Sequence, residues 1–310
     1  MSTVVGRLAP SPTGSLHLGH ARTFLLAWWH ARARGGRVLL RIEDLDQERV
    51  KPGMLAECLA TLAWLGLDWD GEPLVQSREP EPARAALAEL VARGLAYGCD
   101  CSRKDIERAA SAPHAGDGEL RYPGTCRERG LLARGDARLG LRFRVPAGEL
   151  ALEDGCAGPF RSDVAREVGD FLLARRDGAF AYQLAVVVDD ARAGVTEVLR
   201  GADLLPSTAR QALLQRALGL ASPRWFHVPL VLDAEGERLA KRSGALALAE
   251  LRARGVDPRA IVAWAAQSAG QVAPEWLTPA ELLPRFDLAR LPRAPVRLTG
   301  ADRPAFLGSA

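Results

Sequence analysis

Apolar residues in the first part of the chain form short continuous runs that alternate with segments of helical spacing. The segments at 4–8 and 37–44 have the length of strands, and the second, "RVLLRIED", is nearly continuous in apolar residues, as is typical of a strand buried in a parallel sheet. Between them a helical pattern covers residues 18–34 and ends at a pair of glycines. A second helix is predicted from Pro52 to about Gly66. This strand–helix–strand–helix order predicts a doubly wound α/β sheet.

The pattern changes between Cys99 and about Arg161. Glycine and proline are frequent there, and only one short strand, "LRFRVP", is indicated. We interpret this segment as an insertion between two halves of the α/β domain. Strand signals return at 182–190 ("YQLAVVVDD") and at 195–201 ("VTEVLRG"), so the second half of the sheet is expected after the insertion.

A last strand and a helical C-terminal part complete the pattern. Thr208 and Gln211 have the spacing of a capping box and predict a helix through Leu218. The segment 227–233 ("HVPLVLD") is predicted as the last strand, and the pattern beyond Gly244 is helical. Helices are expected over 246–254, over 258–268 and from Thr278 onward. The predicted fold class is therefore α/β, a split parallel sheet followed by a small helical subdomain.

Composition and charge narrow the class of protein. The chain has 310 residues, of which 48% are hydrophobic and 25% charged, and its net charge of +3 permits a polyanionic partner without requiring one. The N-terminus lacks the basic and apolar regions of a signal peptide, and no apolar run is long enough to cross a bilayer. Five cysteines, an odd number, argue against a disulfide framework. We expect a monomeric, cytoplasmic protein that binds no membrane.

The turn between the first strand and the first helix carries the first candidate chemistry. It reads "PSPTGSLHLGH" over residues 10–20. In an open parallel sheet, ligands bind at the carboxyl ends of strands, where a helix N-terminus presents unpaired N–H groups to anions. His17 and His20 add donors for a phosphate, and Gly19 allows a nucleotide to approach the backbone. The turn alone is equally compatible with a tight βα connection bearing two surface histidines.

The longer segment "RLAPSPTGSLHLGHAR", followed by "LRIEDLD", resembles the catalytic core of class I glutamyl-tRNA synthetases. In that family the His-x-Gly-His element binds ATP, and a lysine loop follows the last strand. Here "ERLAKRSGA" (237–245) follows "HVPLVL" and is similar to the family's Lys-Met-Ser-Lys-Ser loop, with Lys241 at the position of the critical lysine. The resemblance covers roughly residues 6–250. It implies a Rossmann-like catalytic domain of class I synthetase type.

The resemblance implies that the carboxylate of glutamate attacks the α-phosphorus of ATP and expels pyrophosphate. Such a reaction depends on positioning and on stabilising negative charge, and it needs no enzyme nucleophile. The implied catalytic residues are His17, His20 and Lys241. Together with Gly19 they also form the implied ATP site, with Mg²⁺ expected on the phosphates.

A glutamate pocket must match two carboxylates and one ammonium group, which calls for guanidinium groups and an acid. By resemblance the pocket consists of Arg7, Leu8, Ala9, Pro10, Ser11, Glu43, Tyr182 and Arg200. Glu43 would hold the ammonium group, and Tyr182 and Arg200 would complete the side-chain pocket. The residues alone are equally compatible with other roles: Glu43 as a surface acid, Arg200 as the ion-pair partner of Asp203, and Tyr182 as a core residue.

Three cysteines in the glycine-rich insertion indicate a structural Zn²⁺, which would compensate for the few core residues there. Cys99 and Cys101 stand close together, and Cys126 follows. For the fourth ligand, His114 is the obvious choice on ligand chemistry. The segment "YPGTC", however, resembles the metal-binding insertion of a short paralogue of the family, which implies Tyr122. Reduced thiols without metal are the alternative; Cys58 and Cys156 are interpreted as structural.

Two departures from full-length glutamyl-tRNA synthetases bear on the acceptor. The segment after Ser243 is expected to be too short for a separate anticodon-binding domain, and "RGADLL" (200–205) stands where those enzymes have Arg-Gly-Glu-Asp-His. Both departures are similar to the short paralogous family of glutamyl-queuosine tRNA(Asp) synthetases. The resemblance implies that ATP and L-glutamate react without tRNA. Glutamate is then transferred to queuosine in the anticodon loop of tRNA(Asp), and Asp203 and Leu204 help to shape the acceptor site.

The expected organisation follows from this assignment. We predict four parts: a first half of the catalytic domain at 1–98, a zinc-binding insertion at 99–165, a second half at 166–236, and the lysine loop with a helical subdomain at 237–310. Two other functions remain open. One is a truncated glutamyl-tRNA synthetase that charges tRNA(Glu) or another carrier, and the other is an inactive, zinc-stabilised RNA-binding paralogue.

Overall fold

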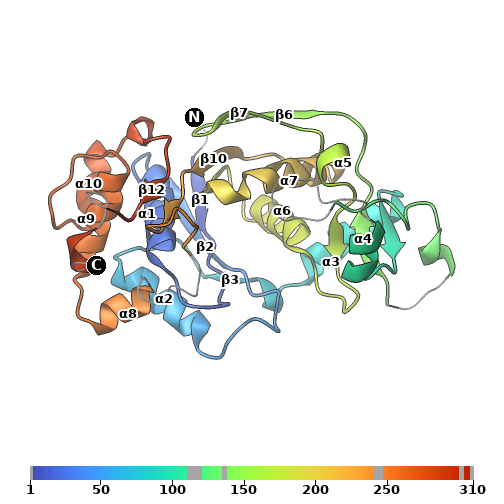
Figure 1. Cartoon of the computed structure of the whole chain (residues 1–310), viewed down its shortest axis with the longest axis horizontal. Helices are drawn as coiled ribbons and strands as arrows, with labels where there is room; N and C mark the ends of the chain where they lie inside the picture. The colour runs from blue at the N-terminus through green and yellow to red at the C-terminus, as the bar shows by residue number, and fades with distance from the viewer. Residues whose placement is uncertain (1–2, 110–120, 135–137, 240–246, 300–303, 308–310) are drawn as a thin grey trace.

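The computed structural model describes residues 3–109, 121–134, 138–239, 247–299 and 304–307 (Figure 1). The helical C-terminal part lies at one end of the molecule, the insertion with α4 lies at the other, and the parallel strands lie between them. Among the described residues, no helix combines the length and apolar character that crossing a bilayer requires.

The first half of the sheet has the predicted strand–helix alternation. Its elements are β1 (Val5–Leu8), α1 (Leu18–Arg32), β2 (Arg37–Ile42), α2 (Met54–Trp64), β3 (Leu74–Val75) and α3 (Glu81–Ala92). The three strands pair in parallel in the order β1-β2-β3, and Leu8 lies opposite Leu40. Both of these leucines are buried, as expected for strands covered on both faces. The strands and helices predicted at 4–8, 18–34, 37–44 and from Pro52 are confirmed.

The second half continues the sheet beside β1. Its elements are α6 (Tyr182–Arg192), β9 (Glu197–Gly201), α7 (Leu205–Ala217), β10 (Arg224–Val228) and β11 (Val231–Leu232). Strands β9 and β10 pair in parallel over five residues. The start of β9 is tied to β1, because the Thr196 amide donates to the Val5 carbonyl at 2.9 Å and the Val5 amide donates to the Thr196 hydroxyl at 2.9 Å. The carboxyl ends of β1, β2 and β9 therefore lie on the same side of the molecule.

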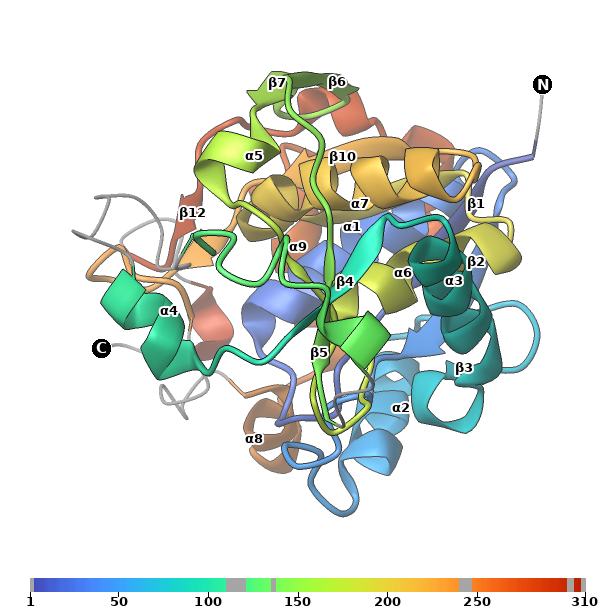
Figure 2. The same ribbon diagram turned by 90° about the vertical axis from the view of Figure 1, so that its right-hand side faces the viewer.

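The insertion contains more strand structure than the single predicted strand. The elements in and next to the segment predicted as the insertion (99–165) are β4 (Ala96–Cys99), α4 (Arg103–Ala109), β5 (Gly140–Phe143), β6 (Leu150–Asp154), β7 (Gly158–Ser162), α5 (Val164–Glu167) and β8 (Leu172–Ala174). Strands β4, β5 and β8 form a small antiparallel sheet. The hairpin β6–β7 instead reaches back to the catalytic sheet, where Asp154 pairs with Trp225 of β10 (Figure 2).

The strand predicted at 182–190 is wrong, because this segment is the helix α6. A short apolar run is compatible with a buried strand or a buried helix, and the valines favoured a strand. The spacing of its buried residues explains why this segment is a helix. Leu184, Val187 and Val188 lie on one side in a hydrophobic cluster, while Asp190 reaches Arg41 of β2 on the other. Packing against α3 and α7 outweighs the preference of valine for strands.

Three further predictions need correction. Helix α7 begins at Leu205, so Thr208 is a buried residue within the helix and caps nothing. Pro229 interrupts the strand predicted at 227–233, since proline has no amide to donate. That segment is not the last strand either, because β12 (Val296–Arg297) pairs in parallel with β11. The region beyond Gly244 is consequently not helical throughout.

The helices predicted in the C-terminal part are present in the described residues. They are α8 (Leu248–Ala253), α9 (Pro258–Ser268) and α10 (Pro279–Leu282), together with short 3-10 turns. The capping box between Thr278 and Glu281 is confirmed by hydrogen bonds of 2.7 Å. Helix α9 packs against α1, and the Trp29 indole donates to the Pro279 carbonyl at 2.9 Å. The C-terminal part thereby shares one hydrophobic core with the first half of the sheet.

Candidate functional site

A cavity of about 440 Å³ opens at the carboxyl ends of β1, β2 and β9. This is the edge at which open α/β sheets bind ligands. The structure brings nearly all described residues of the predicted ATP and glutamate sites to its wall. They are Arg7, Ala9, Pro10, Ser11, His17, Gly19, His20, Glu43, Tyr182 and Arg200. Leu8 differs, because its side chain is fully buried in the core. Lys241 lies outside the described residues, although Arg238 and Leu239 just before it line the cavity.

The two histidines stack at the start of α1. Their ring centroids are 3.6 Å apart, and the His17 amide donates to Nδ1 of His20 at 3.1 Å. Because Nδ1 of His20 accepts, the proton of the neutral ring resides on Nε2, which remains a donor. The pair thus supplies hydrogen-bond donors beside a helix N-terminus, as a phosphate requires.

Gly19 is required by the close approach of this pair. A Cβ atom at Gly19 would lie 3.1 Å from Cε1 of His17 and 3.6 Å from Cβ of Val231. The first distance is tighter than most Cβ contacts in proteins, so even alanine would require the His17 ring to shift by a few tenths of an ångström. The glycine of the His-x-Gly-His motif is explained here by packing against the histidine as well as by space for a ligand.

The acidic side of the cavity is held by an ion-pair network. Glu43 accepts from Arg41 Nη2 at 3.0 Å, and Ser11 Oγ lies 3.5 Å from its other carboxylate oxygen. Arg41 also pairs with the buried Asp190, which lies 3.6 Å from Nε of Arg7. Asp190 therefore offsets the buried guanidinium groups, while Glu43 remains half-buried at the cavity wall. A carboxylate in this position can receive an ammonium group.

Arg200 is the cationic centre of the cavity. Its side chain is buried, with Nη2 3.0 Å from Thr208 Oγ1 and Nε 3.0 Å from Nε2 of His227. Nη1 is also buried and has no hydrogen-bond partner among the described residues. Burial lowers the pKa of Arg200, and the nearby Arg7 guanidinium lowers it further. A carboxylate bound at Nη1 would satisfy this donor and relieve the repulsion.

Tyr182 completes the wall at the first turn of α6. Burial raises the pKa of its phenol, so the hydroxyl stays protonated and can donate at neutral pH. A guanidinium with an unsatisfied N–H, a phenol and a half-buried carboxylate together match a zwitterion with a second carboxylate. Free glutamate has this charge distribution.

The site contains several contacts that the sequence motifs do not predict. Asp203 forms an ion pair with Arg238 at the cavity wall, which contradicts the alternative pairing of Asp203 with Arg200. Thr208 and His227 hold Arg200 from behind. Asp154 then holds His227 from the insertion hairpin. The sequence indicates these contacts in one way only: a histidine, His227, stands within an apolar strand pattern.

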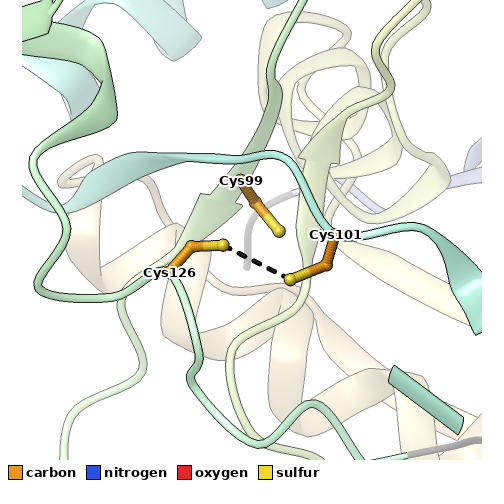
Figure 3. Close-up of side chains that lie close together, drawn as sticks. All are labelled: Cys99, Cys101 and Cys126. Atoms are coloured by element: carbon orange, nitrogen blue, oxygen red, sulfur yellow. Dashed lines mark hydrogen bonds between the residues drawn. The ribbon is translucent and has the colours of Figure 1, made fainter. Parts of the chain in front are cut away.

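The three cysteines of the insertion converge at one place (Figure 3). Their sulfur atoms all lie within 4.8 Å of one another, and those of Cys101 and Cys126 are 3.3 Å apart. Although burial alone would raise it, hydrogen bonds with Tyr122 and Arg142 hold the pKa of Cys99 below its ordinary value. Three thiols this close together are a donor set that can bind a metal ion.

Tyr122 lies beside the three sulfur atoms. Its hydroxyl is 3.4 Å from the Cys99 sulfur and 3.7 Å from the Cys101 sulfur. The other candidate, His114, lies outside the described residues. Cys58 is buried in the main core and Cys156 packs partly against it, in agreement with structural roles.

Comparison with known proteins agrees with this geometry. Residues 3–274 match the family described as "tRNA synthetases class I (E and Q), catalytic domain". Over 98% of both chains, the sequence is 50% identical to the glutamyl-Q tRNA(Asp) synthetase of Symbiobacterium thermophilum. It is 49% identical to the protein of the same name from Deinococcus radiodurans, with 91% of this chain and 96% of the relative covered.

Comparison with solved structures indicates the same family. A glutamate tRNA ligase from Elizabethkingia meningosepticum, determined in complex with its amino acid, matches with a TM-score of 0.83 and 26% identity. The match covers 97% of this chain and 68% of that one. The glutamate-tRNA synthetase of Elizabethkingia anophelis matches with a TM-score of 0.84 over 99% of this chain and 70% of that one. By these likenesses, the chain belongs to the class I tRNA synthetases of the glutamate and glutamine type, and among them to the glutamyl-Q tRNA(Asp) synthetase family.

Proposed function

We propose that the protein activates L-glutamate with ATP and transfers it to queuosine in the anticodon loop of tRNA(Asp). The observation that carries this proposal is the match, over nearly the whole chain, to relatives named glutamyl-Q tRNA(Asp) synthetases. The cavity adds chemical support, because Arg200 offers an unsatisfied guanidinium nitrogen opposite an acid suited to an ammonium group.

In the first step an oxygen of the α-carboxylate attacks the α-phosphorus of ATP. The bond from that phosphorus to the bridging oxygen breaks, and pyrophosphate leaves with the electron pair. Glu43 and Ser11 would hold the ammonium group, while Arg200 and Tyr182 would hold the side-chain carboxylate. His17, His20 and Lys241 would stabilise the phosphates, and bound Mg²⁺ would neutralise part of their charge. In the second step queuosine attacks the activated carbonyl, and AMP leaves.

A second cavity, of about 780 Å³, supports an RNA acceptor. It lies between the insertion and α6, and Tyr182 lines both cavities, so an acceptor there would stand next to activated glutamate. Its wall carries five arginines and one aspartate: Arg103, Arg142, Arg175, Arg176, Arg210 and Asp170. Arg103 and Arg176 are exposed, and their guanidinium groups suit a phosphate backbone.

The exposed Arg176 allows this placement to be tested. We expect Arg176→Glu to weaken binding of tRNA(Asp) about tenfold, because one phosphate contact is replaced by repulsion, and to leave glutamate-dependent ATP–pyrophosphate exchange unchanged. Filter binding at two salt concentrations measures the first effect. Arg293→Glu, an equal charge change on the C-terminal part, is the control, and equal weakening by both variants would contradict the placement.

We further propose that Cys99, Cys101, Cys126 and Tyr122 bind one structural Zn²⁺. The convergence of three sulfur atoms and one phenol oxygen supports four-coordinate binding. The small cluster around them, with only five buried residues, supports a stabilising role, since so small a core contributes little by itself. The metal would tie β4 to the loop that carries Cys126.

Replacing Cys101 with serine is expected to reduce bound zinc from one equivalent to well below half, with a lower melting temperature. The reason is that serine does not replace a thiolate as a zinc ligand. Metal analysis after dialysis measures the stoichiometry. Cys156→Ser changes a cysteine outside the cluster and should keep the metal. Full zinc content in Cys101→Ser would refute the ligand set.

Glutamate-dependent ATP–pyrophosphate exchange tests the activation step. We expect exchange with glutamate in the absence of tRNA, as the resemblance to the short paralogues implies. Absence of exchange under every condition would favour the inactive RNA-binding paralogue, and exchange only in the presence of tRNA(Glu) would favour a truncated glutamyl-tRNA synthetase.

A further inference from the structure

A chain of buried hydrogen bonds runs from the insertion hairpin into the glutamate pocket. Asp154, at the end of β6, contacts Nδ1 of His227 on β10 at 2.5 Å. Nε2 of His227 in turn accepts from Nε of Arg200 at 3.0 Å. All three side chains are at most 4% exposed. Thr208 accepts from Nη2 of Arg200, and only Nη1 is left for a ligand.

The hydrogen bonds that join Asp154, His227 and Arg200 can all form only in one protonation state of His227. Arg200 has no acceptor atoms, so Nε2 of His227 must carry a lone pair and the ring proton must reside on Nδ1. Asp154, an acceptor, requires that same proton. A neutral ring meets both demands, and burial, together with the Arg200 and Arg7 guanidiniums, favours it by lowering the pKa of His227 despite Asp154.

We propose that Asp154 and His227 are positioning residues for glutamate: Asp154 sets the tautomer of His227, and His227 thereby holds Arg200 with Nη1 directed at the substrate carboxylate. The inference rests on the proposed function of Arg200. It also gives the insertion a role in the amino-acid pocket, because Asp154 comes from the β6–β7 hairpin. An acceptor bound to the insertion could thus influence the glutamate site through this chain.

The surroundings of Asp154 make a sharp test possible. Its Oδ1 accepts from three backbone amides: those of Cys156 at 2.9 Å, Ala157 at 2.8 Å and His227 at 3.0 Å. In Asp154→Asn these amides would keep the oxygen where Oδ1 is, so the new NH₂ group must take the place of Oδ2 and face His227. The ring proton would then have to move to Nε2, where it opposes the Nε–H of Arg200.

We expect Asp154→Asn to raise the KM for glutamate about tenfold or more in ATP–pyrophosphate exchange, with the KM for ATP nearly unchanged. Nitrogen-15 NMR of the imidazole rings should show the proton on Nδ1 of His227 in the wild type and on Nε2 in the variant. Glu197→Gln is the matched control. It alters another buried carboxylate–histidine pair, with His30 at 2.7 Å, at the opposite end of β9.

A second substitution separates positioning from folding. His227→Gln should keep a near-normal KM for glutamate, because its amide can turn its oxygen toward Arg200 and its NH₂ group toward Asp154. His227→Leu offers neither group, so its KM for glutamate should rise about tenfold or more, as in Asp154→Asn. The comparison of these two variants still tests the proposal if Asp154→Asn folds poorly.

Three results would overturn the proposal. They are an unchanged KM for glutamate in Asp154→Asn, an equal rise of both KM values, and a KM for glutamate in His227→Leu no higher than in His227→Gln. Inactivity of the wild type toward glutamate would instead refute the proposed function. The tautomer measurement would then still test whether Asp154 sets the tautomer of His227.

Discussion

Replacing Arg200 with lysine is expected to lower kcat/KM for glutamate in ATP–pyrophosphate exchange by about 100- to 1,000-fold. Lysine keeps the charge but cannot donate at once to His227, to Thr208 and to a substrate carboxylate, as the guanidinium does. Losing one partner of a buried charged contact costs about 3–4 kcal/mol, which corresponds to the expected factor. The effect should fall on the KM for glutamate more than on the KM for ATP.

Arg224→Lys provides the comparison for this variant. Arg224 lies on β10 near the same sheet, but it is exposed and pairs with Glu197 away from the cavity. Steady-state exchange with glutamate and ATP varied separately distinguishes the two variants. A loss of the same size in Arg224→Lys, or a rise of the KM for ATP alone in Arg200→Lys, would contradict the assignment of Arg200 to the glutamate carboxylate.

Lys241→Ala is expected to lower kcat for glutamate activation by about 100- to 1,000-fold and to leave the melting temperature within a degree or two. One charged donor aimed at a developing negative charge contributes about this much to catalysis. The resemblance of "LAKRS" to the family's lysine loop implies that role and a position in a loop, and substitutions in exposed loops seldom change stability by more than about 0.5 kcal/mol. Single-turnover formation of glutamyl-adenylate measures the effect.

A lysine elsewhere in the sequence, Lys51, provides the control for this variant. Lys51→Ala removes an exposed lysine outside both cavities and should retain wild-type turnover. Near-normal adenylate formation by Lys241→Ala would mean that the phosphates are stabilised by the histidine pair and the helix N-terminus without the lysine.

The first half of the fold was predictable because its signals are local. Strand β2 lies in a nearly continuous apolar run, and α1 ends at a pair of glycines. Helix α6 was not predictable in the same way, because its run of three valines also suits a buried strand. Its contacts of Asp189 with Gln76 and of Asp190 with Arg41 join residues far apart in sequence, so no local pattern contains them.

The residues of the candidate site also fall into two groups, those in local motifs and those whose role depends on distant contacts. Arg7, Glu43 and His17 belong to short motifs, so a resemblance could assign them, and the cavity brings them together. Asp154 and His227 belong to no motif. Their contact joins residues 73 positions apart, and its meaning depends on a tautomer that no pattern of residue types contains. The same holds for Tyr122, the proposed fourth zinc ligand, because phenols rarely bind zinc and only resemblance distinguished it from His114.

Transfer of labelled glutamate to tRNA(Asp) tests the central claim most directly. The purified protein, ATP and labelled glutamate are incubated with tRNA(Asp) that carries queuosine, with the same tRNA lacking it, and with tRNA(Glu). We expect label only on the queuosine-containing tRNA(Asp), in a form that survives removal of the 3′ end. Equal labelling of tRNA(Asp) without queuosine, or labelling at the 3′ end of tRNA(Glu), would contradict the account.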